Sequence, residues 1–382
     1  MTKSKVINVG VNDRKVDLFE GLYVVPNGVA YNSYIIADEK TAVLDTVDAN
    51  FSDEWLNNVA RALGGKKPDY LVVLHVEPDH AASVFEFVKK YPDATVVGNA
   101  KTFVMLEQFF DCKFENRLVV AEGDTLSLGE HSLTFVFAPM VHWPEVMVAY
   151  DASEKCLYSA DAFGKFGALD CDEPWIDEAR RYYIGIVGKY GAQVTALFKK
   201  LDGHPLEIIR PLHGPVLTEN LSYYLDAYTK WATYTPEAHG VLVAYSSIYG
   251  HTKAAAELMA AELRANGEKD VVVRDLARDD FYVCVAEAFK YDRLVIASVT
   301  YNGEAFPATR AFVDALVERN YQNRTLAIIE NGSWAAMAAK AITQKLEKSK
   351  NLNIAGTAKV KSALNAESKA EIAQLAKTLA AL

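Results

Sequence analysis

The pattern of apolar and polar positions changes near residue 238, where Pro236 and Gly240 punctuate a polar stretch. Beyond this point, five apolar runs typical of buried strands alternate with five amphipathic runs that have the period of helices. The expected strands are 241–247, 270–276, 293–301, 325–332 and 353–362, and the expected helices are 253–267, 281–290, 307–320, 334–348 and 368–382. Strict alternation of this kind predicts a doubly wound parallel sheet of five strands.

The part of the chain before residue 238 is richer in strands. Short apolar runs separated by turns lie at 21–25, 30–37, 41–47, 70–75, 94–100, 132–139 and 156–161, with helical patterns at 51–63 and 81–91 among them. This arrangement indicates a layered α/β sandwich. We therefore expect two domains, residues 1–238 and residues 239–382.

Composition narrows the classes of function. The chain has 382 residues and a formal net charge of −10, which argues against a nucleic-acid or anionic-membrane partner because both are themselves negative. Neither a signal-peptide pattern nor an apolar run of about 20 residues is visible, so we expect a cytoplasmic protein. The four cysteines form no C-x-x-C pair, so a metal here would have to be held by nitrogen and oxygen.

The stretch "LVVLHVEPDHAAS" at residues 71–83 carries the first candidate site. An apolar run ends there, and His75, Glu77, Asp79 and His80 follow within six residues. Taken singly, a core histidine or a helix-capping Asp would explain each residue. Four groups able to bind metal on one strand-to-helix loop are not explained by capping, for which one Asp would suffice.

Three later apolar runs end in a residue of the same kind. They end at His142, Asp161 and His213. Residues at strand ends converge at one edge of a sandwich, where loops hold a site on a rigid scaffold. His213 is preferred to His204 because it ends a strand in the sequence "HGP".

These residues resemble the signature of the metallo-β-lactamase superfamily, H-x-[HE]-x-D-H followed by single His, Asp and His positions. The resemblance implies an αββα sandwich with a binuclear site. It places His75, Glu77 and His142 on one metal, Asp79, His80 and His213 on the other, and Asp161 as a bridge between them. Hydrolases of the superfamily usually have a histidine where Glu77 stands, and a hard carboxylate there favours iron over zinc. No catalytic residue beyond these ligands is expected.

A second candidate site follows the first strand of the C-terminal half, at "YSSIYGHTK" (residues 245–253). A phosphate belongs at such a helix N-terminus, and no Gly-rich dinucleotide or P-loop pattern is present, so a mononucleotide is favoured. Two further strand ends, 298–307 and 330–336, supply aromatic residues that could stack on a flavin ring. The alternative is that the serines only cap a helix and that Trp334 only packs at a helix start.

The three loops resemble flavodoxin, which implies FMN as cofactor. The residues expected to contact it are Ser246, Ser247, Ile248, Tyr249, Gly250, His251 and Thr252 in the first loop, Ser298, Thr300, Tyr301, Asn302 and Gly303 in the second, and Asn331, Gly332, Ser333 and Trp334 in the third. Members of that family often have a Gly-rich third loop, whereas Ala335 and Ala336 stand here.

The two halves together resemble one family over nearly the whole chain, the flavodiiron proteins. Local matches lie at residues 30–48, 140–147 and 158–164. The sequence departs from the family at Glu145, where Asp is more frequent, and in a shorter stretch between Asp161 and His213.

The resemblance implies an oxidoreductase that reduces dioxygen to water, nitric oxide to nitrous oxide, or both, at an oxo- or hydroxo-bridged non-haem di-iron pair. FMN would relay electrons from an external donor, for which rubredoxin is the implied candidate. A head-to-tail homodimer, or a dimer of such dimers, would bring the FMN of one subunit beside the irons of the other. The differences that set the preference for either gas are expected around Tyr31, Trp143 and Phe163. Two alternatives remain: a zinc hydrolase with a fused flavin domain, and a non-enzymatic FMN electron carrier.

Overall fold

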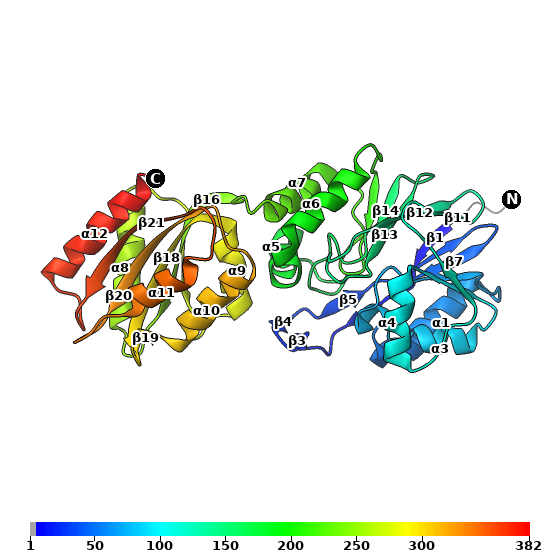
Figure 1. The fold of residues 1–382 in the computed structure, drawn as a ribbon, viewed down its shortest axis with the longest axis horizontal. Helices are drawn as coiled ribbons and strands as arrows, with labels where there is room; N and C mark the ends of the chain where they lie inside the picture. Colours follow the sequence, from blue (N-terminus) through cyan, green and yellow to red (C-terminus); the bar gives the residue numbers. More distant parts are fainter. Residues whose placement is uncertain (1–4) are drawn as a thin grey trace. The chain divides into compact units, whose positions relative to one another are not determined.

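A computed structural model describes residues 5–382 and divides the chain into two compact units (Figure 1). The N-terminal unit runs to Tyr183 and includes Tyr190–Thr229. The C-terminal unit contains Ile184–Lys189 and Lys230–Leu382. Within residues 5–382, no helix is both long and apolar enough to cross a membrane.

The N-terminal unit contains two sheets. The first has the order β1 (Lys5–Asn8), β6 (Tyr34–Ala37), β7 (Thr41–Leu44), β8 (Tyr70–Val72), β9 (Thr95–Gly98) and β10 (Arg117–Val119), and its strands are parallel from β7 onward. The second has the order β11 (Thr125–Ser127), β12 (Ser132–Phe137), β13 (Met147–Asp151), β14 (Cys156–Tyr158) and β15 (Ile208–Arg210). Two small pairs join β2 (Val11–Asp13) to β5 (Val29–Tyr31), and β3 (Leu18–Phe19) to β4 (Tyr23–Val24).

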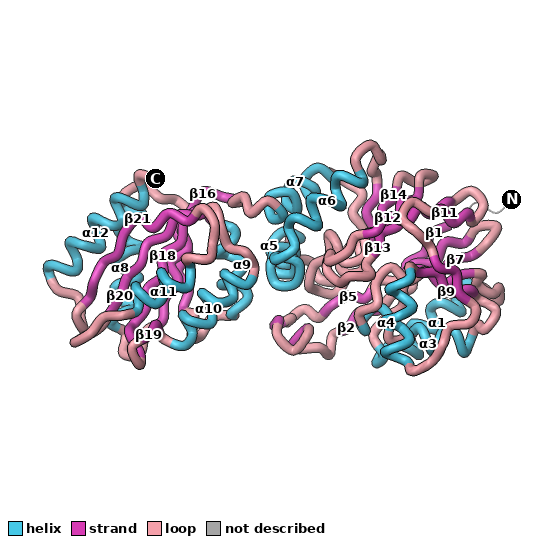
Figure 2. The backbone as a smooth tube through the Cα atoms, viewed as in Figure 1, coloured by secondary structure: helices cyan, strands magenta, loops and turns pink. Residues whose placement is uncertain are grey.

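Helices lie outside the two sheets. The first group is α1 (Ser52–Leu63), α2 (Pro78–Ala81), α3 (Val84–Lys90) and α4 (Ala100–Phe110), and the second is α5 (Trp175–Tyr182), α6 (Gly191–Leu201) and α7 (Leu221–Ala232). Figure 2 shows the strands between these two groups of helices. Helix α1 illustrates the cause, because Trp55, Leu56, Val59 and Leu63 recur at helical spacing and are all buried. The predicted layered α/β sandwich is confirmed.

One predicted strand is two strands in the structure. Residues 30–37 were expected to form a single strand, but β5 and β6 belong to different sheets and are separated by Asn32 and Ser33. The Asn32 side chain donates to the carbonyls of Pro211 and Gly214, and the Ser33 hydroxyl donates to the carbonyl of Asp45. Buried side-chain bonds to a neighbouring loop therefore replace the strand ladder at this point.

The C-terminal unit is a parallel sheet with helices on both faces. The strand order is β17 (Val271–Asp275), β16 (Ala238–Ser246), β18 (Tyr291–Tyr301), β20 (Arg324–Asn331) and β21 (Leu352–Val360), with the short β19 (Glu304–Ala305) paired to β18. Helices α8 (His251–Ala265) and α12 (Ala366–Ala380) pack together on one face, and α9 (Phe281–Lys290), α10 (Pro307–Glu318) and α11 (Ala338–Leu346) lie on the other (Figure 1). The predicted doubly wound five-stranded sheet is confirmed.

Helix α11 starts later than the sequence pattern predicted. The expected helix began at Trp334, but residues 334–337 belong to a loop and the helix starts at Ala338. The hydroxyl of Thr300 accepts from the backbone N–H groups of Met337 and Ala338, at 2.9 and 3.2 Å. A side chain from the neighbouring strand thus caps the helix at this point.

Candidate functional site

The first cluster of candidate ligands follows β8. His75 and Glu77 lie in the loop after this strand, and Asp79 and His80 lie on α2. Glu77 occupies the N-cap position and Pro78 the first helical turn, where a proline is favoured because its missing N–H has no partner to lose. This short helix places Asp79 and His80 directly after the loop that carries His75 and Glu77.

The other three candidate ligands also follow strands. His142 lies after β12, Asp161 after β14 and His213 after β15. Met140 and Ala160, just before two of them, have left-handed backbone conformations with φ of 64° and 50°. Such positions are sparsely populated by residues other than glycine and often mark functional sites.

One group of side chains converges around Glu77. Its Oε2 lies 2.9 Å from Nε2 of His142 and 3.2 Å from Nε2 of His75. The same two nitrogens lie 3.1 and 3.3 Å from Oδ2 of Asp161. His75, Glu77, His142 and Asp161 can therefore present one ligand atom each to a single ion.

A second group converges beside the first. The Nε2 atoms of His80 and His213 lie 3.0 Å apart, and Oδ2 of Asp79 lies 3.3 Å from each of them. These three residues can also present one ligand atom each to a single ion. All of the candidate ligands predicted from the sequence are thus brought into these two groups.

Asp161 lies between the two groups. While its Oδ2 faces His75 and His142, its Oδ1 lies 3.1 Å from Nε2 of His80 and 3.8 Å from Nε2 of His213. One carboxylate that directs each of its oxygens to a different group has the geometry of a bridging ligand.

The chemistry of the cluster fits a pair of divalent or trivalent cations. Both oxygens of Asp79 and of Asp161 are buried and have no hydrogen-bond partner among residues 5–382. Burial raises the pKa of Asp161, but attraction to His75 and His80 outweighs it and holds that pKa well below its usual range. Buried carboxylate oxygens without hydrogen-bond partners fit a role as cation ligands, and imidazole with carboxylate is a donor set that suits non-haem iron.

Two carboxylates behind the cluster were not among the predicted site residues. Oε1 of Glu145 lies 2.8 Å from Nδ1 of His75, and Oδ1 of Asp45 accepts from the backbone N–H groups of Leu74 and His75. Burial, despite these two bonds, raises the pKa of Asp45 to about 8. Asp45 ends the "TAVLD" run at a strand end, which is the same sequence signal that identified Asp161.

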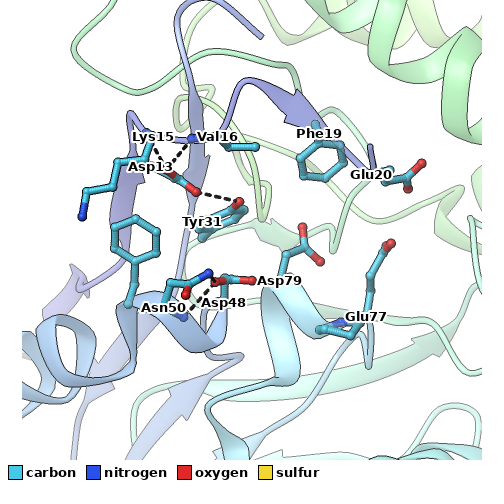
Figure 3. Close-up of a pocket in the computed structure, with 12 residues that line it drawn as sticks. Asp13, Lys15, Val16, Phe19, Glu20, Tyr31, Asp48, Asn50, Glu77 and Asp79 are labelled. Carbon is cyan, nitrogen blue, oxygen red and sulfur yellow. Dashed lines mark hydrogen bonds between the residues drawn. The ribbon is translucent and has the colours of Figure 1, made fainter. Parts of the chain in front are cut away.

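A pocket of about 580 Å³ opens beside the candidate ligands. Its lining residues are Asp13, Lys15, Val16, Phe19, Glu20, Tyr31, Asp48, Asn50, Phe51, Glu77, Pro78 and Asp79. Figure 3 shows Glu20 and Glu77 on one side of this pocket and the Asp13–Tyr31 pair on the other. Desolvation, followed by repulsion from Glu77, raises the pKa of Glu20 to about 7. Of the three residues predicted to tune the site, Tyr31 lines this pocket, whereas Trp143 and Phe163 do not.

The C-terminal unit contains a cavity of about 610 Å³ at the carboxyl ends of β16, β18 and β20. It brings together Ser247, Ile248, Tyr249, His251, Thr252, Thr300, Tyr301, Asn302, Gly303, Asn331, Gly332, Ser333 and Trp334 from the predicted flavin loops. Val299, Ala335, Met337 and Ser362 line it as well, and they were not among the predicted contacts.

Three predicted flavin contacts do not line this cavity. Ser246 is buried and its Oγ accepts from the hydroxyl of Thr309 on α10, while Oγ of the buried Ser298 accepts from the backbone of Phe306. Gly250 takes a left-handed conformation, φ 89°, at the N-cap of α8. Because side chains alternate between the two faces along a strand, Ser246 and Ser298 point away from the cavity. Their position at a strand end did not reveal this direction.

The rim of the cavity carries exposed aromatic rings. Trp334 is 94% exposed and Tyr249 is 88% exposed, from loops on different strand ends. Large aromatic side chains this exposed are unusual on a soluble surface, and here they flank a cavity at the N-terminus of α8, where a phosphate is favoured. The cavity thus has the parts that a flavin mononucleotide requires.

Comparisons with known proteins match both halves of the chain. Residues 29–214 match the model of the ODP family beta lactamase, and residues 242–376 match a flavodoxin domain. A relative named anaerobic nitric oxide reductase flavorubredoxin, from Klebsiella pneumoniae, is 27% identical over 91% of this chain and 74% of its own. The solved structure of rubredoxin oxygen:oxidoreductase from Desulfovibrio gigas is 26% identical with a TM-score of 0.91, and covers 98% of this chain and 96% of its own. The flavodiiron protein from Giardia intestinalis shows the same fold at 24% identity, with a TM-score of 0.88 over 98% of this chain and 94% of its own.

A lactamase-like domain with two converging ligand groups, joined to a flavodoxin domain, defines an oxidoreductase that combines a flavin with a metal pair. The chain belongs to the flavodiiron proteins. Its cofactors are accordingly FMN and a non-haem di-iron pair. The predictions of the family, the fold class, the cofactors and an oxidoreductase activity are confirmed.

Proposed function

We propose that this protein reduces dioxygen to water and nitric oxide to nitrous oxide at the cluster around Asp161. The supporting observation is the pair of ligand groups that share this one carboxylate. The relatives support both gases, since one is named a nitric oxide reductase and another an oxygen oxidoreductase. Both substrates are small and uncharged, so an acidic pocket beside the cluster does not repel them.

The geometry of the two groups supports an assignment of the site residues. His75, Glu77 and His142 would hold one iron, Asp79, His80 and His213 would hold the other, and Asp161 would be shared between them. When bound, the iron pair supplies the redox chemistry that a zinc pair lacks. The protein fixes the ligands at strand ends, keeps the cluster buried, and leaves one pocket through which a small molecule reaches Glu77 and Asp79.

FMN occupies the cavity of the C-terminal unit in this proposal. The free N–H groups at the start of α8, with Ser247 and Thr252, bind the phosphate. Trp334 and Tyr249 cover the ring system from two loops. Electrons reach the FMN from an external donor protein, for which rubredoxin is the proposed candidate.

Transfer between flavin and iron requires the two cofactors to approach each other. We propose a head-to-tail homodimer, in which the cavity of one subunit faces the metal pocket of the other. The exposed aromatic rim of the cavity supports this arrangement, because it offers apolar surface for such a contact. A domain boundary near residue 238 and a cytoplasmic location remain predictions.

Metal analysis followed by gas consumption tests the proposal. Protein purified without oxygen from iron-replete cells is expected to hold about two irons per chain and little zinc. With reduced rubredoxin as donor, it should then consume dioxygen in one assay and nitric oxide in another. Two zincs without iron would overturn the proposal in favour of a hydrolase, and iron-loaded protein that consumes neither gas would favour an electron carrier.

A further inference from the structure

The two ligand groups differ in the hydrogen-bond partners of the imidazole nitrogens that face away from the cluster. Nε2 of His75 faces the cluster, so Nδ1 points away from it and lies 2.8 Å from Oε1 of Glu145. Nδ1 of His213 lies 2.8 Å from the backbone oxygen of Ala30, and Nδ1 of His80 is buried with no hydrogen-bond partner among residues 5–382. Nδ1 of His75 therefore has a carboxylate as its partner, whereas Nδ1 of neither imidazole in the second group has a charged partner.

The carboxylate of Glu145 is paired with His75. Glu145 is 1% exposed, and the ion pair with His75 is the one that the described residues give it. Its Oε1 also accepts from the backbone N–H of Val76 at 2.9 Å, while its Oε2 is buried without a hydrogen-bond partner.

The backbone of Glu145 is held in place by the side chain of Asn99. The side chain of Asn99 donates to the carbonyl oxygen of Glu145, at 2.5 Å, and also caps α4 by accepting from the N–H groups of Lys101 and Thr102. The position of Glu145 is thus tied to the first sheet through β9 and α4. A carboxylate fixed in this way sets both the tautomer and the orientation of the ring that it contacts.

We propose that Glu145 is a positioning residue that makes His75 a stronger donor and renders the two iron positions inequivalent. The Nδ1–H of His75 donates to the carboxylate, which increases electron density at Nε2, where the metal binds. The iron held by His75, Glu77 and His142 is then harder to reduce than the iron held by Asp79, His80 and His213. This inference rests on the proposed iron occupancy and adds an order in which the two irons accept electrons.

Replacing Glu145 by glutamine distinguishes the effect of the negative charge from the effect of the side-chain shape. Glutamine has nearly the same volume, and its side-chain oxygen can still accept from His75 and from the backbone of Val76. A purely structural role is therefore retained in E145Q, whereas the negative charge is lost. The matched control is D151N, which neutralises another buried carboxylate partnered by a histidine, His131, in the second sheet and outside the cluster.

The primary measurement is a dithionite titration of the ⁵⁷Fe-loaded protein, followed by Mössbauer and EPR spectroscopy. Dithionite supplies the electrons one at a time: two reduce the FMN, which its absorbance reports separately, and each of the other two converts one ferric iron to ferrous iron. In the wild type, the first electron should localise on one iron. In E145Q, the iron reduced second should become about tenfold easier to reduce, which is about 59 mV for a one-electron couple, and one quadrupole doublet should move while the other stays. D151N should match the wild type.

The outcomes distinguish this inference from the proposed function. A wild-type protein that contains no iron would overturn the proposed function. A wild type with two irons, together with an E145Q variant whose potentials and doublets are unchanged, would overturn the role of Glu145 alone. If E145Q does not load iron, the zinc-loaded wild type decides by ¹H–¹⁵N NMR. His75 should then show a downfield Nδ1–H signal, and a deprotonated Nδ1 would overturn the inference.

Discussion

The Nε2 atoms of His80 and His213 lie 3.0 Å apart, although 133 positions separate the two residues in the sequence. Both side chains are fully buried, and Asp79 lies 3.3 Å from each nitrogen. A shared cation would join these three groups without leaving a buried charge unpaired. Because Asp161 belongs to this group and to the neighbouring one, the ligands should not contribute equally to metal binding.

Metal content tests this difference between a terminal and a bridging ligand. H213A removes one ligand of the second group and should leave about one iron per chain, whereas D161A removes the bridge and should leave close to none. Mass spectrometry of protein purified without oxygen measures both values. H204A is the matched control, because His204 contacts Tyr150 outside the cluster and its removal should preserve both irons. Equal iron loss in H213A and D161A would contradict the bridging role.

Aromatic stacking is expected to contribute to FMN binding. Trp334 and Tyr249 flank the cavity from two loops, and an aromatic pair contributes about 0.5–1.5 kcal/mol beyond its buried area. W334A and Y249A should each weaken FMN binding by up to about tenfold, as measured by the quenching of flavin fluorescence. Y223A, which removes an exposed tyrosine from α7, should bind FMN as the wild type does. Wild-type affinity in both cavity variants would argue against stacking by these rings.

Much of the molecule could be predicted because its patterns are local. The alternation of strands and helices beyond residue 241 is visible without tertiary information, since each element has its own period. The candidate ligands could be found because each follows an apolar strand. Asp45 has the same signal, but a single carboxylate after a strand also suits a turn, so the signal alone does not identify it as part of the site.

The features that could not be predicted depend on contacts between distant segments. Thr300 lies on a different strand from the loop before α11, and it fixes the end of that loop by accepting a hydrogen bond from Met337. Asn32 interrupts a predicted strand because its side chain bonds to Pro211 and Gly214. Glu145 acts through His75, 70 positions away. No local period contains such information, because each partner alone is compatible with several conformations.

The cysteine thiols should differ in reactivity according to burial. Burial raises the pKa of Cys156 to about 12 and that of Cys284 to about 12, and neither residue is exposed. Cys112 is partly exposed, and burial raises its pKa as well. Because the thiolate is the reactive form, Cys112 should react with DTNB at pH 8 in the folded protein, whereas Cys156 and Cys284 should react only in urea.

The same two thiols predict a loss of stability in alkali. Their folded pKa values lie above the unfolded value near 9, so the folded state retains protons that the unfolded state releases. Their contribution to the free energy of unfolding is therefore complete below about pH 9 and is lost as the pH rises toward 12. Urea titrations of C156A and C284A should show a shallower decline over this range, and a slope equal to that of the wild type would contradict the shifted pKa values.

Thr300 should stabilise both a helix and the third flavin loop. Its hydroxyl accepts from Met337 and Ala338, and the loop that it fixes carries Ser333 and Trp334 on the cavity wall. T300V keeps the β-branched shape but removes the acceptor, so it should lower the free energy of unfolding by about 1 kcal/mol, the usual value of a helix cap. FMN affinity should fall as well, because the loop is then free to leave the cavity.

Urea unfolding and FMN titration of the same preparation measure the two effects of T300V together. T325V is the matched control, because Thr325 lies at the opposite end of β20 from the cavity and should change neither quantity. A T300V variant that binds FMN weakly but unfolds like the wild type would assign Thr300 a direct contact with the flavin. Loss of stability with unchanged affinity would instead show that the loop keeps its conformation at the cavity without the cap.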